Sequence, residues 1–463
     1  MEKYDLIILG SGAAAFGAAI KAVDLGAKVA MIEKGTIGGT CVNVGCVPSK
    51  HLLLVGEINY YRNHGHAGLD VSTTLDFTAT INEKREIVQG LRNGRYIDVI
   101  DALGITLVKG KAVFVSKNEV KVNGRILQAE KFIIATGSSP HIIPLDGIEK
   151  VDYLTNVEAM ELSELPESMV ILGGRALGLE FAQMFSHFGT KVTVLQRSPR
   201  IIPEEEGIIS DYLKTYLEEE GINIQTNVGL KGVRKERGNI IVSALVEDEK
   251  REFEAEKLLM STGRKPNTRD IGLEKAGIEI SDNGEIIVNE EMRTSTPNIW
   301  AAGDVLGEPM LETVAGKEGA IAAENALTNR GKKMDFGAVP HAVFTIPQVA
   351  SVGLTEKQAD DKGITCRCSA IPMELVPKAL LAKDTRGLIK MVIDARTERI
   401  IGVHILASLA ADMIHEGVLA VKYGLTIDDI IDTVHVFPTM AEAVKLVAQS
   451  FRKDISKMSC CAE

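Results

Sequence analysis

The feature that most constrains the fold is a strand, a glycine turn and a helix that follow one another at the N-terminus. A short apolar strand leads directly into Gly10-Ser-Gly12-Ala-Ala-Ala15, and a helix of small residues begins there. Gly10 permits a tight turn, Gly12 lets the backbone approach a pyrophosphate, and Ala15 allows helix and strand to pack closely. The next strand ends in Glu33, 23 residues after Gly10, where a carboxylate can hold a ribose hydroxyl. The pattern predicts a dinucleotide-binding βαβ unit.

The same pattern occurs again at Gly173-Gly-Arg-Ala-Leu-Gly178, with Arg175 at the position of the middle glycine. The following strand ends beside Arg197 and lacks the carboxylate that would hold a free 2′-hydroxyl. Arg197, with Arg200 close by, suits the 2′-phosphate of NADPH, although a solvated basic loop would have the same composition. Two units predict two dinucleotides, a flavin at the first and a nicotinamide at the second, with hydride transfer between them.

Later segments extend this arrangement. One apolar strand ends in Gly303-Asp304, where an acid can reach a polyol chain. From about residue 336 alternating β patterns and helical stretches at 412–423 and 440–451 predict a third domain without nucleotide chemistry. The glutamate runs 204–206 and 218–220 are expected on the solvated face or at the end of a surface helix. Two further strands end in runs of small residues, which are typical of places where the chain crosses between domains. One run contains Thr136 and Gly137, and the other contains Gly263 and Arg264.

Composition narrows the possible partners. Asp and Glu number 63 against 52 Lys and Arg, for a formal net charge of −11, which argues against nucleic acid as the main partner. No apolar run approaches the roughly 18 residues that span a bilayer, and the N-terminus lacks the pattern of a secretion signal. We therefore expect a soluble cytoplasmic protein with no membrane or nucleic-acid partner.

The six cysteines form three close pairs and cannot be a disulfide framework. Cys41 and Cys46 are five positions apart, so a regular helix would separate them, whereas a glycine-rich turn entering a helix can bring them together. The dipole at that helix start would favour thiolate, so we prefer a reversible redox pair beside the flavin to two ordinary buried cysteines. Cys366 and Cys368 would share one face of a strand and could form a third thiol pair, but ordinary strand positions are the preferred interpretation.

With these motifs in this order, the chain from Tyr4 to about Phe451 resembles the flavoprotein pyridine nucleotide–disulfide oxidoreductases, the family of dihydrolipoamide dehydrogenase and glutathione reductase. The resemblance implies FAD as the flavin, with Cys46 nearest to it and Cys41 as the interchange thiol. It also implies a homodimer in which the partner's C-terminal region completes the active site. The resulting cofactor-binding set is Gly10, Gly12, Ala15, Glu33, Gly39, Thr40, Lys50, Thr136, Gly137, Gly173, Gly178, Glu180, Arg197, Gly263, Arg264, Gly303 and Asp304, with Lys50 and Glu180 paired near the flavin and Asp304 on the ribityl chain.

One departure from the disulfide-reducing members lies before Pro438. Those members carry a His directly before the Pro of a Pro-Thr-x-x-Glu stretch, where it protonates the departing thiolate. Here that position is Phe437, which cannot titrate, while Glu442 is kept. His435 is two positions early and is interpreted as a surface or structural residue. Without this proton donor, we expect the chain to reduce lipoamide-type or glutathione disulfides only very slowly.

The second departure is the terminal pair Cys460-Cys461. A disulfide between adjacent cysteines is strained, but on a mobile tail the two thiolates can clasp a soft metal ion; the alternative is an incidental pair at a frayed terminus. Both departures are typical of the branch of the family that reduces Hg(II). The segment 376–380 and Tyr153 also resemble the sequence pattern of that branch. The second tyrosine of that branch is Phe437 here, and the branch's separate N-terminal metal-binding domain has no counterpart in the sequence.

The resemblance therefore implies a metal relay. Thiols on the partner subunit's tail would take Hg(II) from small-thiol complexes and pass it to the flavin-proximal pair, and reduced flavin would convert it to Hg(0). The catalytic set is Cys41, Cys46, Cys460, Cys461, Tyr153, Lys50, Glu180 and Glu442, with the four cysteines as Hg(II) ligands. The alternatives are a dihydrolipoamide dehydrogenase-like disulfide reductase and a protein that sequesters metal without turnover.

The expected fold class is α/β, with two Rossmann-like dinucleotide-binding domains and an α+β dimerisation domain. We expect the FAD domain at 1–145 and 268–336, the NADPH domain at 146–267, and the dimerisation domain with the Cys-Cys tail at 337–463.

Overall fold

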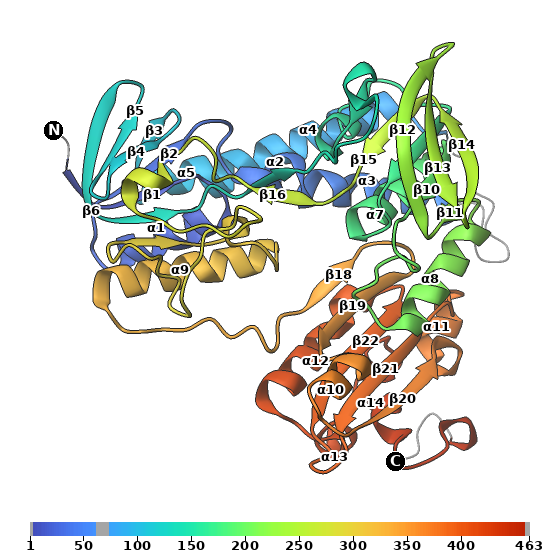
Figure 1. Ribbon diagram of the computed structural model, residues 1–463. Coiled ribbons are helices and arrows are strands. Elements are labelled where there is room, and N and C mark those ends of the chain that lie inside the picture. The colour runs from blue at the N-terminus through green and yellow to red at the C-terminus, as the bar shows by residue number, and fades with distance from the viewer. Residues whose placement is uncertain (1–2, 62–73, 459–463) are drawn as a thin grey trace.

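Residues 3–61 and 74–458 are described by a computed structural model, in which the chain is built around three large sheets (Figure 1). The first sheet has the order β3-β2-β1-β6-β5-β4, with β17 beside β6. Strands β1, β2, β3, β6 and β17 pair in parallel, and β4 and β5 are antiparallel. The bounds are β1 Lys3–Leu9, β2 Val29–Glu33, β3 Thr106–Lys109, β4 Val113–Ser116, β5 Glu119–Val122, β6 Arg125–Ile134 and β17 Ile299–Ala301.

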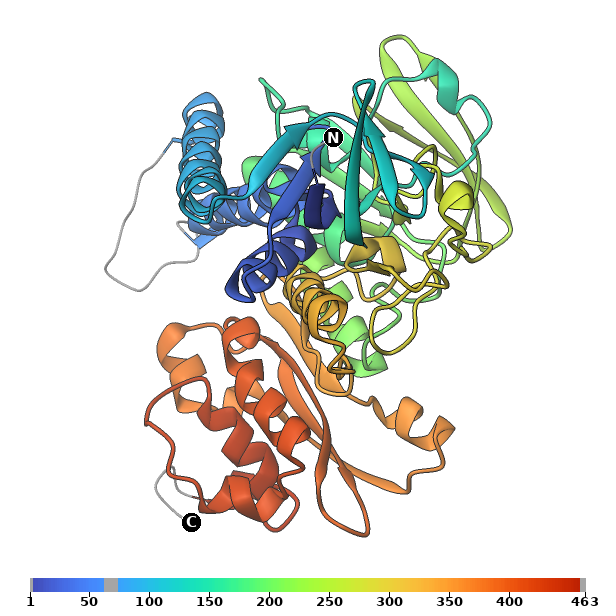
Figure 2. The same ribbon diagram turned by 90° about the vertical axis from the view of Figure 1, so that its left-hand side faces the viewer.

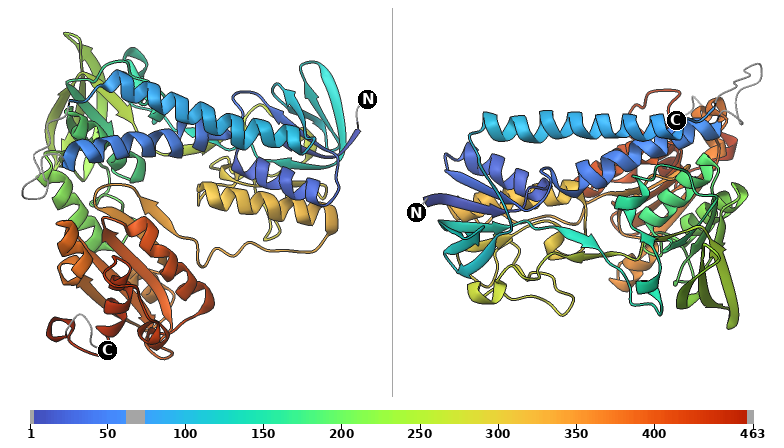
Figure 3. Two further views of the ribbon diagram at one scale, coloured as in Figure 1. Left: turned by 180° about the vertical axis from the view of Figure 1, so that it is seen from behind. Right: turned by 90° about the horizontal axis from the view of Figure 1, so that it is seen from above.

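Two helices pack closely on this sheet, α1 (Ala13–Asp24) and α9 (Glu312–Thr328), which lie side by side in dark blue and gold in the left view of Figure 3. Glycines make the approach possible, because a Cβ atom at Gly17 would lie 2.1 Å from the carbonyl oxygen of Gly316. A Cβ atom at Gly319 would lie 1.9 Å from the carbonyl oxygen of Ala14. The contact brings the turn after β17 close to the turn after β1.

A second helix pair runs lengthwise from the first sheet toward the second, as Figure 3 shows. It consists of α3 (Cys46–Tyr61) and α4 (Phe77–Arg92), and the short α2 (Gly39–Val44) precedes α3. Helix α4 continues through a π turn, Asn93–Ile97, into α5 (Asp98–Ala102). Asp76 caps α4, since its side chain accepts a hydrogen bond from the amide of Ala79.

The second sheet has five parallel strands in the order β11-β10-β9-β15-β8. An antiparallel meander, β12-β13-β14, and a two-stranded ribbon, β7-β16, accompany it. The helices are α6 Asn156–Ala159, α7 Ala176–Phe188 and α8 Gly207–Glu219. The strand bounds are β7 Ser138–Pro140, β8 Tyr153–Leu154, β9 Ser168–Leu172, β10 Lys191–Leu195, β11 Asn223–Gln225, β12 Val228–Glu236, β13 Asn239–Val246, β14 Glu249–Ala255, β15 Lys257–Met260 and β16 Arg264–Pro266.

The third sheet is antiparallel, in the order β18-β19-β22-β21-β20. Helices α12 and α14 cover one of its faces, and α8 contacts β22; the sheet and its helices form the orange and red part of Figure 2. The strands are β18 His341–Val343, β19 Gln348–Gly353, β20 Cys366–Pro372, β21 Leu388–Asp394 and β22 Ile400–Ala407. The helices are α10 Glu356–Asp361, α11 Pro377–Ala382, α12 Ala410–Tyr423, α13 Ile427–Asp432 and α14 Glu442–Gln449.

The expected α/β class is confirmed. The helix expected at 440–451 is shorter, because its two ends form turns around α14. The expectation for the glutamate runs is wrong in part. Glu205 and Glu206 are buried, since the start of α8 packs against the third sheet, and the side chain of Glu220 is 3% exposed. Within the described ranges, no helix combines the length and hydrophobicity that crossing a membrane requires.

Candidate active site

The first glycine turn lies where β1 ends and α1 begins. Gly10 has a φ of +114°, and a Cβ atom there would lie 2.1 Å from the carbonyl oxygen of Ala135, so only glycine fits. Glu33, at the end of β2, accepts hydrogen bonds from the Ser11 hydroxyl at 2.6 Å and from the amide of Gly35 at 2.6 Å. Its carboxylate is therefore held beside the turn. Gly12 is the N-cap of α1, and Ala15 is fully buried.

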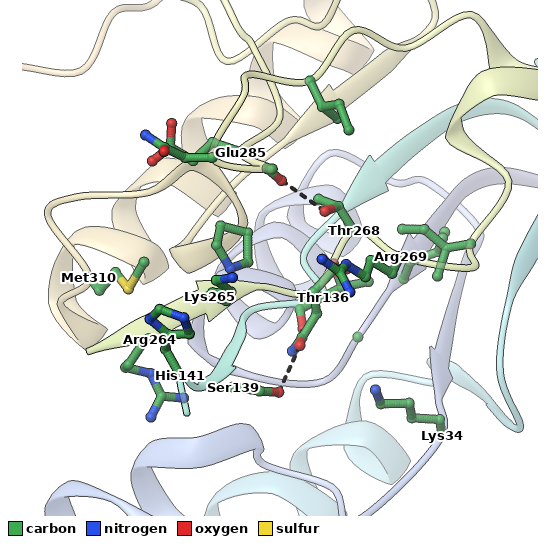
Figure 4. Close-up of a pocket in the computed structure, with 18 of the residues that line it drawn as sticks. Lys34, Thr136, Ser139, His141, Arg264, Lys265, Thr268, Arg269, Glu285 and Met310 are labelled. Atoms are coloured by element: carbon green, nitrogen blue, oxygen red, sulfur yellow. Dashed lines mark hydrogen bonds between the residues drawn. The ribbon is translucent and has the colours of Figure 1, made fainter. Parts of the chain in front are cut away.

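A cavity of about 930 Å³ opens from this turn. Its lining includes Gly10, Glu33, Thr136 and Arg264 from the predicted cofactor set, and Figure 4 shows the basic side chains of Lys34, Lys265 and Arg269 around it. The volume is that of a site for a large organic cofactor, and the cations suit phosphate groups. These features fit FAD at this end of the first sheet.

The ribbon of β7 and β16 crosses from the first sheet to the second beside this cavity. The Thr136 hydroxyl donates to the carbonyl oxygen of Asn267 at 2.8 Å, and the Asn267 amide donates back to the carbonyl oxygen of Thr136 at 2.9 Å. Gly137 and Gly263, at the two ends of the ribbon, have φ values of +67° and +102°. The two runs of small residues identified in the sequence are thus paired with each other.

Asp304 lies at the start of a 3₁₀ turn, Asp304–Leu306, directly after Gly303. Its carboxylate accepts a hydrogen bond from the Ser138 hydroxyl at 2.6 Å, and the Arg264 guanidinium lies 3.9 Å away. Burial lowers the pKa of Arg264, and Asp304 opposes that shift. The buried Glu318, which no sequence motif marks, accepts a hydrogen bond from the amide of Gly303 at 2.8 Å and holds this turn in place.

The segment from Gly39 to Cys46, called the thiol loop, packs directly on the first glycine turn. A Cβ atom at Gly39 would lie 2.5 Å from the Cα atom of Gly12. Gly45 separates α2 from α3, and a Cβ atom there would lie 2.8 Å from the carbonyl oxygen of Thr40 and 3.0 Å from the Cα atom of Cys41. This tight turn brings Cys46, the first residue of α3, against Cys41.

The two thiols hydrogen-bond to each other and differ in acidity. The hydrogen bond to Cys41 lowers the pKa of Cys46 to about 7, and Lys50 also lowers it, while burial opposes both. The hydrogen bond to Cys46, together with burial, raises the pKa of Cys41. The exposed Cys46 is thus the thiolate of the pair near neutral pH, and Cys41 keeps its proton.

Lys50 and Glu180 form the predicted ion pair, with Nζ and Oε2 2.7 Å apart. The other oxygen of Glu180 accepts the backbone amide of Phe344 at 2.9 Å, and the Lys50 ammonium lies 4.6 Å from the centre of the Phe344 ring. Phe344 lies 164 residues from Glu180. No local pattern in the sequence signals its place in the site.

The second glycine turn lies between β9 and α7. A Cβ atom at Gly178 would lie 1.9 Å from the carbonyl oxygen of Gly173, so the helix starts in close contact with the turn. Arg197 is exposed after β10, whereas Arg200 pairs with Asp211, with nitrogen–oxygen distances of 2.9 and 3.0 Å. The exposed guanidinium fits the 2′-phosphate of NADPH.

The remaining residues singled out in the sequence come from later segments of the chain. Tyr153 begins β8. Asn156, which no sequence motif marks, donates a hydrogen bond to the carbonyl oxygen of Val44 at 2.6 Å and ties this segment to α2.

Within the described residues, one oxygen of Glu442 is buried without a hydrogen-bond partner, and burial raises the pKa of that carboxyl. His435 pairs with Glu416 at 2.8 Å, in agreement with a structural role. Cys460 and Cys461 lie outside the described residues.

Comparisons with known proteins define the class to which this site belongs. The pyridine nucleotide-disulphide oxidoreductase family matches residues 4–319, and the dimerisation domain of that family matches residues 339–448. The chain therefore belongs to this family, which confirms the resemblance in the sequence.

Similar proteins narrow the class further. A mercuric reductase of Lysinibacillus sphaericus is 44% identical over 100% of this chain and 85% of its own length. A mercuric reductase of Streptomyces lividans is 42% identical over 99% of this chain and 98% of its own. Among solved structures, the Cu(II) complex of the HOCl-induced flavoprotein disulfide reductase RclA from Escherichia coli matches with a TM-score of 0.88 and 30% identity, covering 98% of this chain and 100% of that one.

Proposed function

We propose that the chain reduces Hg(II) to Hg(0) with electrons from NADPH, through bound FAD. The observation that carries this proposal is the thiol pair Cys41–Cys46 on the first glycine turn, in a chain whose residue before Pro438 cannot titrate. A soft metal ion needs two thiolates and moves by ligand exchange. A disulfide substrate would need a proton donor where Phe437 stands.

The chain's own residues fit both cofactors. The turn at Gly10 and Gly12 would admit the pyrophosphate of FAD, Glu33 would hold its ribose, and Asp304 would face its ribityl chain. When bound, the flavin carries an electron pair from NADPH to the thiol side of the site. Arg197 would hold the 2′-phosphate of NADPH beyond β10.

The thiols would act in sequence because their acidities differ. Once the partner's tail thiols hold Hg(II), the Cys46 thiolate would displace one of them, and Cys41 would displace the other while its proton leaves with that tail thiolate. Hg(II) would then lie between the two sulfur atoms and gain two electrons to become Hg(0), which leaves. No side chain has to act as a general base, since the departing thiolate accepts the proton.

A homodimer would complete the site. Three side chains in the loop before α14 are exposed in the isolated chain, Val434 by 88%, Val436 by 75% and Phe437 by 51%, an apolar surface that a second copy would cover. Cys460 and Cys461 of the partner subunit would deliver Hg(II), and Tyr153 would supply a hydroxyl near the metal. We place the reaction in the cytoplasm, where small thiols are kept reduced.

The test is NADPH oxidation by the purified flavoenzyme, with Hg(II) in excess small thiol, oxidised lipoamide or oxidised glutathione as substrate. We expect turnover with Hg(II) and little with either disulfide. Cys41→Ser and Cys46→Ser should each lower the rate with Hg(II) by about 100-fold or more, because each removes one of two required ligands. Turnover with a disulfide and none with Hg(II) would show instead a disulfide reductase, the alternative from the sequence.

A further inference from the structure

A second pair of thiols lies far along the chain, on the edge strand β20 of the third sheet. Cys366 and Cys368 are two residues apart on this strand, so their side chains point to the same face of the sheet. Arg367, between them, points to the opposite face, where its guanidinium lies 5.6 Å from the centre of the Phe451 ring. Both cysteines are half-buried, and burial, the Glu356 carboxylate and the neighbouring Cys366 thiol all raise the pKa of Cys368.

The geometry does not suit a disulfide. Residues i and i+2 of a strand have Cα atoms about 6.7 Å apart and nearly parallel Cβ directions, whereas a disulfide needs Cβ atoms about 3.8 Å apart. An ion between the two sulfur atoms has no such restriction, since it replaces the short S–S bond with two longer metal–sulfur bonds.

Neighbouring carboxylates do not complete a larger ligand set. The Cys366 sulfur lies 3.9 Å from a carboxylate oxygen of Asp360, too far for a shared ion without movement. Glu356, next to Cys368, is already paired with the Lys390 ammonium at 2.6 Å. Within the described residues, no group of three or more His, Cys, Asp or Glu side chains is arranged to hold a metal. Zn²⁺ prefers four ligands, so the pair fits an ion that is satisfied by two thiolates.

We propose that Cys366 and Cys368 bind one soft, two-coordinate metal ion between their sulfur atoms, and that Hg(II) is such an ion for this chain. The step is ligand exchange without oxidation or reduction. Hg(II) bound to two small thiolates passes to the two cysteines, two mercury–sulfur bonds break and two form, and the two cysteine protons leave on the small thiols. Burial raises the pKa of Cys368 to about 12, which distinguishes this pair from the reactive thiolate at Cys46.

The pair lies on the strand that contacts the segment leading to the C-terminal tail, so it could exchange Hg(II) with the tail thiols. The Arg367 guanidinium donates to the carbonyl oxygen of Phe451 at 3.5 Å, so the chain that leads to the tail leaves the third sheet beside β20. Cys460 follows Phe451 by nine residues in the sequence and lies outside the described residues. Exchange of Hg(II) between this pair and the tail thiols rests on the proposed function; binding at the pair does not.

The first experiment isolates the pair in the holoenzyme. Cys41, Cys46, Cys460 and Cys461 are all replaced by Ser, and retained flavin and the far-UV spectrum confirm the fold. We expect this variant to retain one Hg(II) per chain after gel filtration in competing monothiol. Adding Cys366→Ser, as the matched control with one thiol, should weaken binding by about 100-fold or more, because the second thiolate then comes from solution. Equal binding by the two proteins would overturn the proposal, as would equally tight retention of Zn²⁺.

The second experiment needs no variant. Parallel samples of the wild-type holoenzyme, with and without three Hg(II) per chain, are treated with iodoacetamide for a time that fully alkylates Cys366 and Cys368 in the metal-free sample, and alkylation is read by mass spectrometry. Joint protection of Cys366 and Cys368 is expected, and unchanged alkylation of their peptide would contradict the site. NADPH oxidation by Hg(II) is measured separately, so a failure of the proposed function would leave the binding result standing.

Discussion

At the scale of single residues, the site depends on two neighbouring groups that tune Cys46. Its hydrogen bond with Cys41 and the charge of Lys50 both favour the thiolate, against the effect of burial. The two thiols are identifiable in the sequence because their motif is local. The order of their acidities depends on the Gly45 turn, which presses Cys46 against Cys41.

The acidity of Cys46 gives a prediction about pH. A lowered pKa means that the thiolate forms above its titration point, so the rate of Cys46 alkylation in the reduced enzyme should rise with pH through a midpoint near 7. Cys41→Ala removes the hydrogen bond that lowers the pKa of Cys46 most, so it should move that midpoint to higher pH. Alkylation rates measured by mass spectrometry over a pH series provide the check, and an unmoved midpoint would mean that the hydrogen bond is not the cause.

The Lys50–Glu180 pair gives a prediction about stability. Glu180 is 5% exposed, so Lys50→Met leaves its carboxylate without a cation in a mostly buried position. We expect a loss of about 1–3 kcal/mol in the free energy of unfolding, with weaker flavin retention. Urea denaturation followed by flavin fluorescence measures both. Lys121→Met, at an exposed position of β5, is the matched control and should change little.

At the scale of secondary-structure elements, close helix contacts position the glycine turns. Both fingerprint turns were predictable from the sequence, since strand, glycines and helix are adjacent in the chain. The partner of α1 was not, because α9 lies about 300 residues later and its Gly319 carries no local signal of a contact with Ala14.

The contact between α1 and α9 can be tested with alanine. Gly319→Ala would place a methyl group 1.9 Å from the carbonyl oxygen of Ala14, so the helices must separate, at a cost of about 1–3 kcal/mol. Gly90→Ala, in α4 with no atom within 4 Å of the new Cβ, should instead stabilise by about 0.5–1 kcal/mol. Thermal unfolding distinguishes the two, and equal effects would show that the helices do not meet as described.

At the scale of the whole molecule, buried ion networks tie α7 and α8 to the third sheet. Glu205 accepts the Ser351 hydroxyl at 2.5 Å and pairs with His341, and Glu206 pairs with Lys390 at 3.0 Å. Glu220 bonds His187 at 3.0 Å and Arg386 at 2.7 Å. Phe344 reaches the Lys50–Glu180 pair from the same segment as His341, so these networks also help to position the flavin side of the site.

The pair of His341 and Glu205 predicts how stability varies with pH. Burial alone would lower the pKa of His341, but its hydrogen bond with Glu205 outweighs burial and raises it; the same bond lowers the pKa of Glu205 against burial. Stability from protonated His341 is fully present below its unfolded pKa of about 6.5 and is lost as pH rises through the raised folded value. Stability from Glu205 is present above its unfolded pKa of about 4.3 and is lost as pH falls through the lowered value.

His341→Gln should therefore flatten the decline of stability as the pH rises above about 6.5. Glu204, Glu206, His404 and Lys390 surround the pair and are the same residues in both proteins, so the difference between wild type and variant is assigned to His341. Melting temperatures across the pH series give the measurement. His415→Gln, at an exposed position of α12, is the control, and a decline that persists unchanged in His341→Gln would contradict the prediction.

The sequence by itself determined the chemistry of this protein wherever the reacting groups are close together in the chain. The glycine turns, the Cys41–Cys46 pair and Phe437 before Pro438 each form a short motif with one physical explanation. Tertiary structure alone decided which groups outside these motifs support them: Glu318, on the helix that follows Gly303, Phe344 against Glu180, and the burial of Glu205, which the sequence suggested was solvated. The reason is that burial and hydrogen bonding depend on which surfaces pack together, and a contact between residues over a hundred positions apart leaves no periodicity in either segment.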